Sequence, residues 1–255
     1  MSVTNALLLS NSSNVNLAYL IHADDVINDF FSGVSEVVFA PWALADHDAY
    51  TAKVASAFDR HGIRVVGLHS VEDPAAAIRD AGGIYVGGGN TFRLTGALHA
   101  LDLLEPIRAA VARQLRYSGA SAGSLVACPT MRTTNDMPIV QPPSLETLGL
   151  IPFQLNCHYL DADPNSTHAG ESRELRLREF HEDNDVAVLG LREGTWLRVQ
   201  RHGESTSAAV GGTAVSPTAP GPAILHQRGQ LPVEVSGDVS DLLSLTPRFD
   251  APAAA

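Results

Sequence analysis

Cysteine is almost absent from this chain. Cys128 and Cys157 are the only two among 255 residues, and neither belongs to a C-x-x-C pair. Two cysteines are too few for a disulfide framework, so we expect both thiols to stay free in a reducing compartment, the cytoplasm.

Positive charge is also scarce. The chain has 17 lysines and arginines against 28 aspartates and glutamates, a formal net charge of −11. Nucleic acids and anionic membrane surfaces both require a cationic face, so neither is an expected partner. Exposed charges are screened beyond ~8 Å at physiological salt, so the net charge does not prevent a few local arginines from binding an anion inside a pocket.

Long apolar runs and metal-binding spacings are missing as well. No run of ~18 apolar residues occurs, and no charged and then apolar leader follows Met1, so the sequence predicts neither a membrane span nor a secretory signal. There is no H-E-x-x-H motif and no close cluster of histidines and acids. We therefore expect no metal and no other cofactor.

The chain does have enough apolar side chains for a large core. Hydrophobic residues make up 45% of the sequence and charged residues 18%. Residues 1–246 are therefore expected to form one domain, near the upper size for a single core. Residues 247–255 are rich in proline and alanine and are predicted to form a frayed tail.

Apolar runs without polar alternation mark the expected strands, and segments of helical spacing separate them. The expected strands are residues 6–9, 37–40, 63–68, 84–86, 118–120, 153–158 and 186–191, followed by 195–199, 207–210 and 223–225. The expected helices are residues 17–31, 46–61, a segment from 73 onward, 92–101, 103–117 and 171–181. This order predicts an α/β fold with a mostly parallel sheet flanked by helices on both faces and a C-terminal antiparallel β region. Such sheets bind ligands beyond the carboxyl ends of their strands.

The stretch YSGASAGSL at residues 117–125 contains the spacing Gly119-x-Ser121-x-Gly123. This spacing is typical of a nucleophile elbow, in which a serine lies on a strained turn between a strand and a helix. With an imidazole beside it and the Ala122 amide facing the developing oxyanion, such a serine can attack a carbonyl group. Glycine, alanine and serine are also common in tight turns, so the spacing alone leaves a purely structural turn open.

The segment after the elbow, ACPTMRTTNDMPIV at residues 127–140, favours a long ordered loop. Four further motifs accompany it: VGGGNTF at 86–92, NCH at 156–158, ESRE at 171–174 and EGTW at 193–196. Together these segments resemble the peptidase E family, serine-type α-aspartyl dipeptidases with a flavodoxin-like, class I glutamine amidotransferase-like fold. The resemblance extends over residues 6–210.

The resemblance implies a serine exopeptidase that hydrolyses dipeptides with an N-terminal aspartate through an acyl-enzyme. It implies Ser121 as the nucleophile, His158 as the general base and then acid, and Glu193 as the carboxylate that orients the imidazole. Asp136 is a competing third member, and it could instead hold the free α-ammonium group of the substrate. Successive side chains of a strand point to opposite faces, so Cys157 is expected in the core if His158 faces the site.

Gly88 and Gly89 follow the expected strand at residues 84–86. The G-x-G-x-x-G spacing and the P-loop lysine are both missing, which disfavours a nucleotide phosphate site. The remaining alternatives are a tight turn and an oxyanion hole, in which the Gly88 or Gly89 amide acts together with that of Ala122. The resemblance favours the oxyanion hole.

The resemblance also places Asn90 and Arg132 among the residues that bind substrate, together with Asp136. Arg173 is the first candidate, and Arg132 the second, for a guanidinium that holds the aspartyl carboxylate with two parallel hydrogen bonds. Arg176 is expected on the solvated face of its helix.

Two other functions stay open. A cyanophycinase-like or amidotransferase-like hydrolase of other acidic amides would be expected to lack the loop at 132–138, which is present. A non-catalytic binding module would be expected to have lost Ser121, His158 or Glu193, which are all present. The expected partner is a small acidic peptide, and the sequence leaves a homo-oligomer open.

Overall fold

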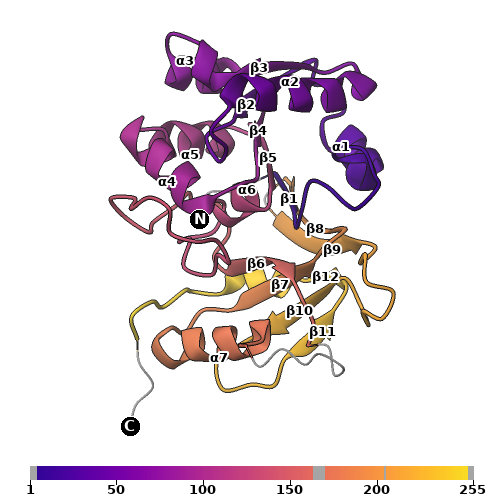
Figure 1. Ribbon diagram of the computed structural model, residues 1–255, viewed down its shortest axis with the longest axis vertical. Helices are drawn as coiled ribbons and strands as arrows, with labels where there is room; N and C mark the ends of the chain where they lie inside the picture. The colour runs from indigo at the N-terminus through magenta and orange to yellow at the C-terminus, as the bar shows by residue number, and fades with distance from the viewer. Residues whose placement is uncertain (1–4, 163–169, 204, 252–255) are drawn as a thin grey trace.

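The computed structural model describes residues 5–162, 170–203 and 205–251, and within them the strands form two sheets (Figure 1). The larger sheet has eight strands in the order β12-β9-β8-β1-β5-β4-β2-β3. They are β1 (Ala6–Leu9), β2 (Glu36–Ala40), β3 (Arg64–Gly67), β4 (Gly83–Val86), β5 (Arg116–Ala120), β8 (Thr195–His202), β9 (Ser205–Gly212) and β12 (Gly237–Asp238). Strands β1 to β5 pair in parallel, whereas β8, β9 and β12 are antiparallel. The predicted fold class is confirmed.

The parallel strands supply two separate cores. In β1, Leu7 and Leu9 belong to one core and Leu8 to the other, and in β2 Phe39 and Val38 divide in the same way. This division follows from the alternation of side chains along a strand. Both faces of the sheet are therefore buried, as apolar strands without polar alternation require.

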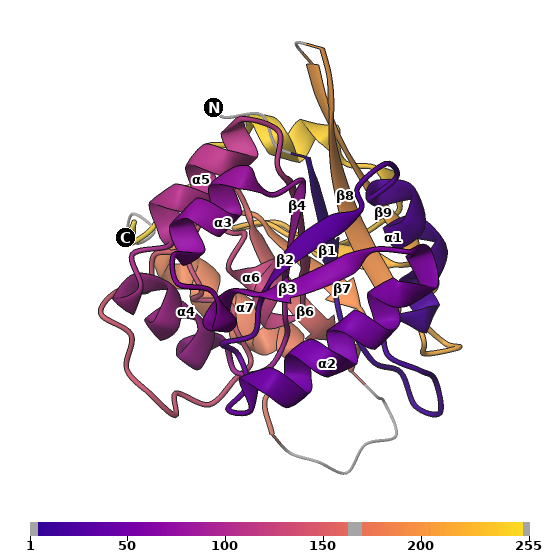
Figure 2. The ribbon, with the colours of Figure 1, turned by 90° about the horizontal axis from the view of Figure 1, so that it is seen from above.

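Helices cover both faces of this sheet (Figure 2). On the face of Leu7 lie α1 (Asp24–Phe30) and α2 (His47–Phe58), with the short 3-10 helices η1 (Ile21–Ala23) and η2 (Asp59–His61) beside them. On the face of Leu8 lie α3 (Pro74–Asp80), α4 (Thr91–Ala100) and α5 (Leu104–Ala112), with η3 (Leu68–Ser70) before α3. The side chains of Asp46 and Asp73 accept hydrogen bonds from the amides of Ala49 and Ala76 and cap α2 and α3.

The second sheet has four strands in the order β11-β10-β7-β6. They are β6 (Gln154–Tyr159), β7 (Val188–Arg192), β10 (Ala223–His226) and β11 (Val233–Val235). One face, with Leu155 and Leu189, joins the core of Leu8, and the other packs against α7 (Arg173–Asp183) through Leu177. Because β6 and β7 are parallel and α7 connects them, α7 begins at the edge where both strands end.

One predicted helix, residues 17–31, begins later than expected. The backbone is left-handed at Asn16 and Leu20, with φ of 61° and 62°, and the α-helix starts only at Asp24. The side chain of Tyr19 meanwhile points into the protein and contacts two other tyrosine hydroxyls. Apolar spacing here therefore reflects tertiary packing of an irregular segment and not a helix.

The predicted helix at 103–117 ends early. Helix α5 stops at Ala112, Gln114 has a φ of 80°, and Arg116 and Tyr117 already pair with the neighbouring strands. Tyr117 is therefore the second residue of β5, which begins two residues earlier than the predicted strand at 118–120.

The prediction of a frayed tail at 247–255 is wrong for residues 247–251. Ala251 N donates to Asp183 O at 2.7 Å, and Arg248 N donates to Asp185 O at 3.1 Å. These bonds attach the C-terminal segment to the end of α7. Residues 252–255 lie outside the described residues.

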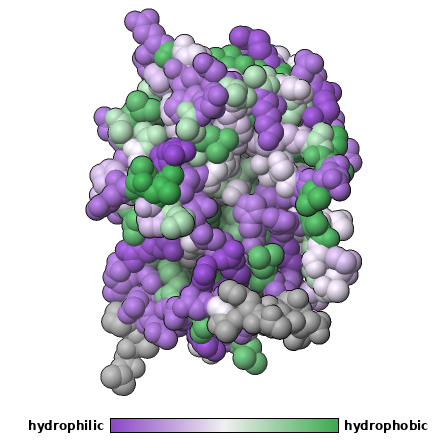
Figure 3. All heavy atoms as spheres, viewed as in Figure 1, coloured by the Kyte–Doolittle hydropathy of each residue, from purple (hydrophilic) through white to green (hydrophobic). Residues whose placement is uncertain are grey.

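None of the helices in the described segments is long and apolar enough to cross a membrane. The remaining short elements are α6 (Ala122–Leu125) and η4 (Ser240–Ser244). On the face seen in Figure 3, hydrophilic residues predominate and hydrophobic ones form separate groups.

Candidate active site

Ser121 lies directly after β5, the strand between β1 and β4 in the sheet. Its backbone has φ 52° and ψ −110°, an unfavourable conformation for a residue with a side chain. A Cβ atom at Gly119 would lie 2.3 Å from Gly123 O, and one at Gly123 would lie 2.0 Å from Val86 O. Only glycine fits at these two positions, so the G-x-S-x-G spacing does form a strained elbow.

Hydrogen bonds hold the elbow against its neighbours. The buried Ser124 Oγ lies 2.7 Å from Leu9 O and 2.9 Å from Gly119 O, and these two carbonyl oxygens share its single proton. Tyr117 Oη donates to Gly123 O at 2.6 Å. These bonds hold the turn in its strained backbone conformation, which is unfavourable without such contacts.

His158 reaches Ser121 from the second sheet. The pairing of β6 with β7 shifts between Asn156 and Tyr159, and His158 has a φ of 54° in this bulge. Its amide donates to Ser10 Oγ at 2.9 Å, and Ser10 Oγ in turn donates to Leu191 O at 2.8 Å. Cys157 is buried in the core, as the alternation of side chains predicted.

Ser121, His158 and Glu193 form a chain of hydrogen bonds. His158 Nε2 lies 2.9 Å from Ser121 Oγ, and His158 Nδ1 lies 2.7 Å from Glu193 Oε1. The side chains of His158 and Glu193 are each 40% exposed. In this geometry the carboxylate accepts the Nδ1 proton, so that Nε2 is free to take the proton of the serine hydroxyl.

Asp136 is not part of this chain. Its Oδ2 accepts hydrogen bonds from Thr91 N at 2.7 Å and Thr91 Oγ1 at 2.6 Å, at the start of α4. A carboxylate is favourable there because it faces the positive end of the helix dipole. The alternative in which Asp136 orients His158 is therefore wrong.

The loop that contains Asp136 runs along β6. Thr133 Oγ1 donates to Leu155 O at 2.6 Å, and Asn135 Nδ2 donates to Cys157 O at 3.0 Å. These contacts connect the strand that carries His158 to the start of α4. The predicted long ordered loop thus supports the site from one side.

The glycine turn lies next to the elbow. A Cβ atom at Gly88 would lie 2.9 Å from Ala120 O and 3.2 Å from Ser121 Cβ. Gly89 has a φ of 137°, which residues with side chains rarely adopt. The Gly88 amide faces the Tyr50 hydroxyl. Among the described residues, the backbone amides of Gly89 and Ala122 donate to no protein acceptor.

Asn90 and Arg132 are occupied elsewhere. Asn90 Oδ1 accepts a hydrogen bond from Arg93 N, and its Nδ2 donates to Met137 O at 2.9 Å, so the amide holds the start of α4 in place. Arg132 forms two hydrogen bonds with Asp250, at 2.7 and 2.9 Å. In this structure the Arg132 guanidinium holds the C-terminal segment, and its role as a substrate-binding residue stays a prediction.

Arg173 is the first residue of α7. Its Nε is buried and has no hydrogen-bond partner in the part of the chain that the structure describes. Burial lowers the pKa of Arg173, and the positive charge of Arg176 lowers it further. A partly buried guanidinium whose Nε has no partner among the described residues is a potential site for a carboxylate.

Three residues near the site were not singled out from the sequence. Ser10 holds His158, and Asn11 Oδ1 accepts a hydrogen bond from Gly194 N at 2.8 Å, next to Glu193. His22 lies close to Glu193; burial lowers the pKa of His22, whereas the carboxylate raises it by a smaller amount. Ser10 and Asn11 could have been found, because they follow a buried strand at its carboxyl end.

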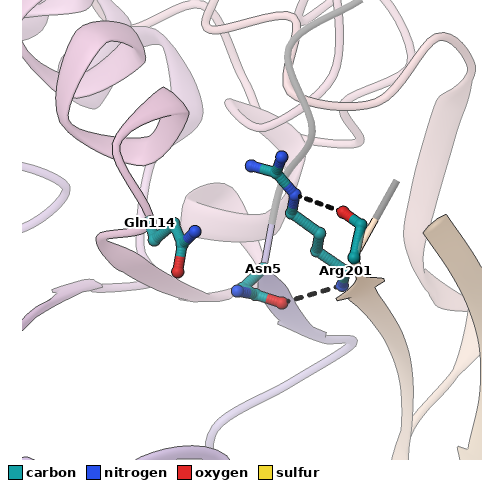
Figure 4. A pocket seen from close by; sticks show the side chains of 4 residues that line it. Asn5, Gln114 and Arg201 are labelled. Atoms are coloured by element: carbon teal, nitrogen blue, oxygen red, sulfur yellow. Dashed lines mark hydrogen bonds between the residues drawn. The ribbon is translucent and has the colours of Figure 1, made fainter. Parts of the chain in front are cut away.

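A polar cavity of about 380 Å³ lies away from this site (Figure 4). Asn5, Gln114 and Arg201 line it, and Arg201 N donates to Asn5 Oδ1 at 2.9 Å. Asn5 and Gln114 precede β1 and β5, so the cavity lies at the opposite edge of the sheet from Ser121. No group of three or more histidine, cysteine or acidic side chains in the described segments could hold a metal ion.

Comparison with known proteins identifies the family. The profile of peptidase family S51 matches residues 6–206. The chain belongs to peptidase family S51. A peptidase E of Streptomyces coelicolor is 52% identical to this S51 peptidase over 248 residues, which cover 96% of this chain and 98% of that protein. A protein of Drosophila melanogaster named "Probable alpha-aspartyl dipeptidase" is 50% identical over 202 residues, 78% of this chain and 84% of that protein.

A solved structure agrees with the fold. The peptidase from an acI-B1 actinobacterium matches this S51 peptidase with a TM-score of 0.62 at 17% identity, covering 93% of this chain and 97% of that one. Membership of family S51 confirms the resemblance found in the sequence motifs and makes the protein a peptidase.

Proposed function

We propose that this S51 peptidase hydrolyses dipeptides with an N-terminal aspartate through an acyl-enzyme on Ser121. The observation that carries the proposal is the hydrogen-bonded chain from Ser121 Oγ through His158 to Glu193, at 2.9 and 2.7 Å, on a strained elbow. The names of the relatives, peptidase E and alpha-aspartyl dipeptidase, support the substrate class.

The chemistry follows from the geometry of the chain. His158 Nε2 takes the proton of Ser121 as Oγ attacks the peptide carbonyl carbon, and Glu193 stabilises the resulting imidazolium. The same proton then passes to the leaving amine, the C–N bond breaks, and an aspartyl ester of Ser121 remains. A water molecule, deprotonated by His158, hydrolyses this ester and releases aspartate.

The oxyanion of each tetrahedral intermediate requires two donors. The amides of Gly89 and Ala122 are suited to this role. Ala122 follows Ser121 in the chain, Gly89 follows Gly88, whose Cβ position would lie 3.2 Å from Ser121 Cβ, and neither amide donates to a protein acceptor among the described residues. The Gly88 amide is the weaker candidate, since it faces the Tyr50 hydroxyl.

Recognition of the aspartyl side chain is assigned to Arg173. Helix α7 begins at the edge where β6 and β7 end, which is the edge that carries His158 and Glu193. The partly buried Arg173 therefore belongs to the correct side of the second sheet and lacks a described acidic partner. A bidentate pair with a carboxylate would satisfy it, whereas an amide would leave part of its charge unpaired.

Asp136 is assigned to the α-ammonium group of the substrate. Its Oδ2 binds Thr91, but its Oδ1 accepts no hydrogen bond within the described part of the chain. The proposal also places the protein in the cytoplasm. Its support is that Cys128 and Cys157 are both buried free thiols.

The first experiment measures hydrolysis of Asp-Leu, Asn-Leu, Glu-Leu and β-aspartyl-leucine by the purified protein. Ser121→Ala should lower kcat on Asp-Leu by ~10³-fold or more, because the nucleophile is lost while the elbow backbone keeps its shape. Ser56→Ala, an exposed serine on α2, is the matched control and should behave as the parent. Near-normal turnover by Ser121→Ala would refute the serine mechanism.

The second experiment addresses selectivity. Arg173→Met should remove most of the preference for Asp-Leu over Asn-Leu, because the cation that discriminates the two is lost. Arg176→Met is the control on the same helix, since Arg176 is exposed and pairs with Glu171 at 3.3 Å. Equal selectivity of Arg173→Met and the parent would show that another group reads the side chain.

A further inference from the structure

Three tyrosine hydroxyls meet beside the elbow. Tyr19 Oη lies 3.1 Å from Tyr50 Oη and 3.1 Å from Tyr85 Oη. Tyr19 comes from the segment after β1, Tyr50 from the first turn of α2, and Tyr85 from β4. The rings pack in the core on the α1 and α2 face of the sheet, with Tyr50 edge-on to Phe39 at 5.0 Å. Three polar groups from three elements thus share one buried position.

Tyr50 contacts the glycine turn directly. A Cβ atom at Gly87 would lie 2.6 Å from Tyr50 Oη, so only glycine lets the phenol approach the backbone this closely. The next amide, that of Gly88, faces the same hydroxyl oxygen. The phenol therefore lies against two consecutive residues of the turn.

Two other amides of the turn donate to backbone acceptors. Gly87 N donates to Ala40 O at 3.2 Å, and Asn90 N donates to Ala43 O at 2.9 Å. The Gly88 amide faces the Tyr50 hydroxyl, and the Gly89 amide donates to no acceptor among the described residues. The orientation of the Gly88 peptide thus determines which amide remains for a ligand.

Tyr19 extends the same network to the opposite side of the elbow. Its hydroxyl also contacts the side chain of Ser12, in the loop after β1. In the sheet, β1 and β4 lie on either side of β5, so the loops after β1 and β4 flank Ser121. The tyrosine hydroxyls therefore connect Ser12, in the loop after β1, with the glycine turn after β4.

The network acts by hydrogen bonding and not by proton transfer. Burial raises the pKa of Tyr19, Tyr50 and Tyr85 far above the ordinary value for a phenol. Near neutral pH all three hydroxyls are therefore protonated, and each keeps one donor and its acceptor lone pairs.

We propose that Tyr50 is a positioning residue for the oxyanion site. Its hydroxyl, held by Tyr19, takes up the Gly88 amide and fixes the turn so that the Gly89 amide acts together with that of Ala122. This inference rests on the proposed acyl-enzyme mechanism. Without the hydroxyl, the Gly88 N–H would lose the acceptor that it faces among the described residues, and the peptide would rotate to find another.

The test is Tyr50→Phe, which keeps the ring and its packing. Because the role concerns the oxyanion, kcat on Asp-Leu should fall by ~10-fold with KM unchanged, about the effect of one neutral hydrogen bond. Affinity for an aldehyde analogue of aspartate, which forms a tetrahedral adduct with Ser121, should fall by the same factor. Inhibition by the product aspartate should not change.

The control is Thr51→Val, which removes a hydroxyl from the same turn of α2. Among the described residues this hydroxyl donates to His47 O and to no other acceptor. It should match the parent in every measurement. Tyr19→Phe, which leaves the Tyr50 hydroxyl without its partner, should give a smaller loss of ~3-fold in kcat and in aldehyde affinity. Thermal unfolding of each variant shows whether it is folded.

Hydrolysis of p-nitrophenyl acetate tests the inference about Tyr50 separately from the proposed substrate. The rate measured with Ser121→Ala is subtracted as the background that does not depend on the nucleophile. The ester needs the oxyanion site but no aspartyl recognition, so Tyr50→Phe should lose ~10-fold on it as well. If the parent cleaves the ester but no aspartyl dipeptide, the substrate proposal fails and Tyr50 is still tested. If Tyr50→Phe matches the parent on both substrates, or raises KM without changing aldehyde affinity, the inference about Tyr50 is wrong. If Ser121→Ala keeps both activities, both proposals are wrong.

Discussion

Replacing Glu193 by glutamine removes a negative charge from His158 and leaves the side-chain shape unchanged. The pair is 2.7 Å apart, and both side chains are 40% exposed. With an effective dielectric constant of ~40 to ~80 for such a half-exposed pair, the carboxylate stabilises the imidazolium by ~1.5 to ~3 kcal/mol. A glutamine amide can also present its N–H₂ to Nδ1, which favours the tautomer with the proton on Nε2 and blocks the base.

We therefore expect Glu193→Gln to lower kcat by ~10²-fold, with KM changed by less than ~3-fold. The loss should be the same on Asp-Leu and on p-nitrophenyl acetate, because both reactions need His158 as the base. Steady-state rates between pH 6 and 9 measure it, and a pre-steady-state burst shows whether acylation is the slow step.

Asp136→Asn is the matched control, a second carboxylate-to-amide exchange beside the site. It should weaken binding of Asp-Leu, whose α-ammonium group would lose its partner, but leave hydrolysis of p-nitrophenyl acetate unchanged. A loss below ~3-fold for Glu193→Gln on the ester, or a larger loss there for Asp136→Asn, would refute the assignment of Glu193.

Two further predictions concern stability. Burial lowers the pKa of His226 to about 4, so the folded protein keeps the ring neutral while the unfolded chain takes up a proton below pH ~6.5. The contribution of His226 to the free energy of unfolding is therefore largest above pH ~6.5 and falls by ~3 kcal/mol toward pH ~4. Urea denaturation at several pH values should show this fall in the parent and a smaller one in His226→Gln, and parallel curves would contradict the reasoning. Arg192 is buried and donates five hydrogen bonds, to Asp161, Glu234 and Gly221 O. Arg192→Met leaves the two carboxylates unpaired and should lower the free energy of unfolding by ~3 kcal/mol. Arg248→Met is the control: it breaks the exposed pair with Asp185 and should lower the free energy of unfolding by less than ~1 kcal/mol. Equal urea midpoints for the two variants would show that the bonds of Arg192 do not stabilise the protein.

The elbow and the parallel strands could be predicted from the sequence because local chemistry dictates them. Glycine is required where two backbone segments lie too close together for a Cβ atom, as at Gly119 and Gly123. The spacing of these two glycines around Ser121 therefore already implies the turn. Apolar runs such as residues 6–9 lack polar alternation because both their faces are buried, and this pattern is visible without coordinates. The motif resemblance added His158 and Glu193, which no local rule selects.

Only the tertiary structure decided the partners of the charged side chains. Arg132 pairs with Asp250, 118 residues away, and Asp136 with Thr91, 45 residues away. Neither contact leaves a periodic or compositional trace, because a long side chain takes the nearest acceptor that folding brings to it. The same holds for residues 247–251, whose composition predicts fraying but whose backbone bonds to the end of α7.

The position of His158 depends on both levels. The sequence determined that it follows a buried cysteine on a strand and therefore points away from the core. A bulge in β6, the Ser10 hydroxyl and the packing of a second sheet against the first determined that it reaches Ser121. Alternation along a strand is a local property of the backbone, whereas the relative position of two sheets depends on contacts between residues that are far apart in the chain.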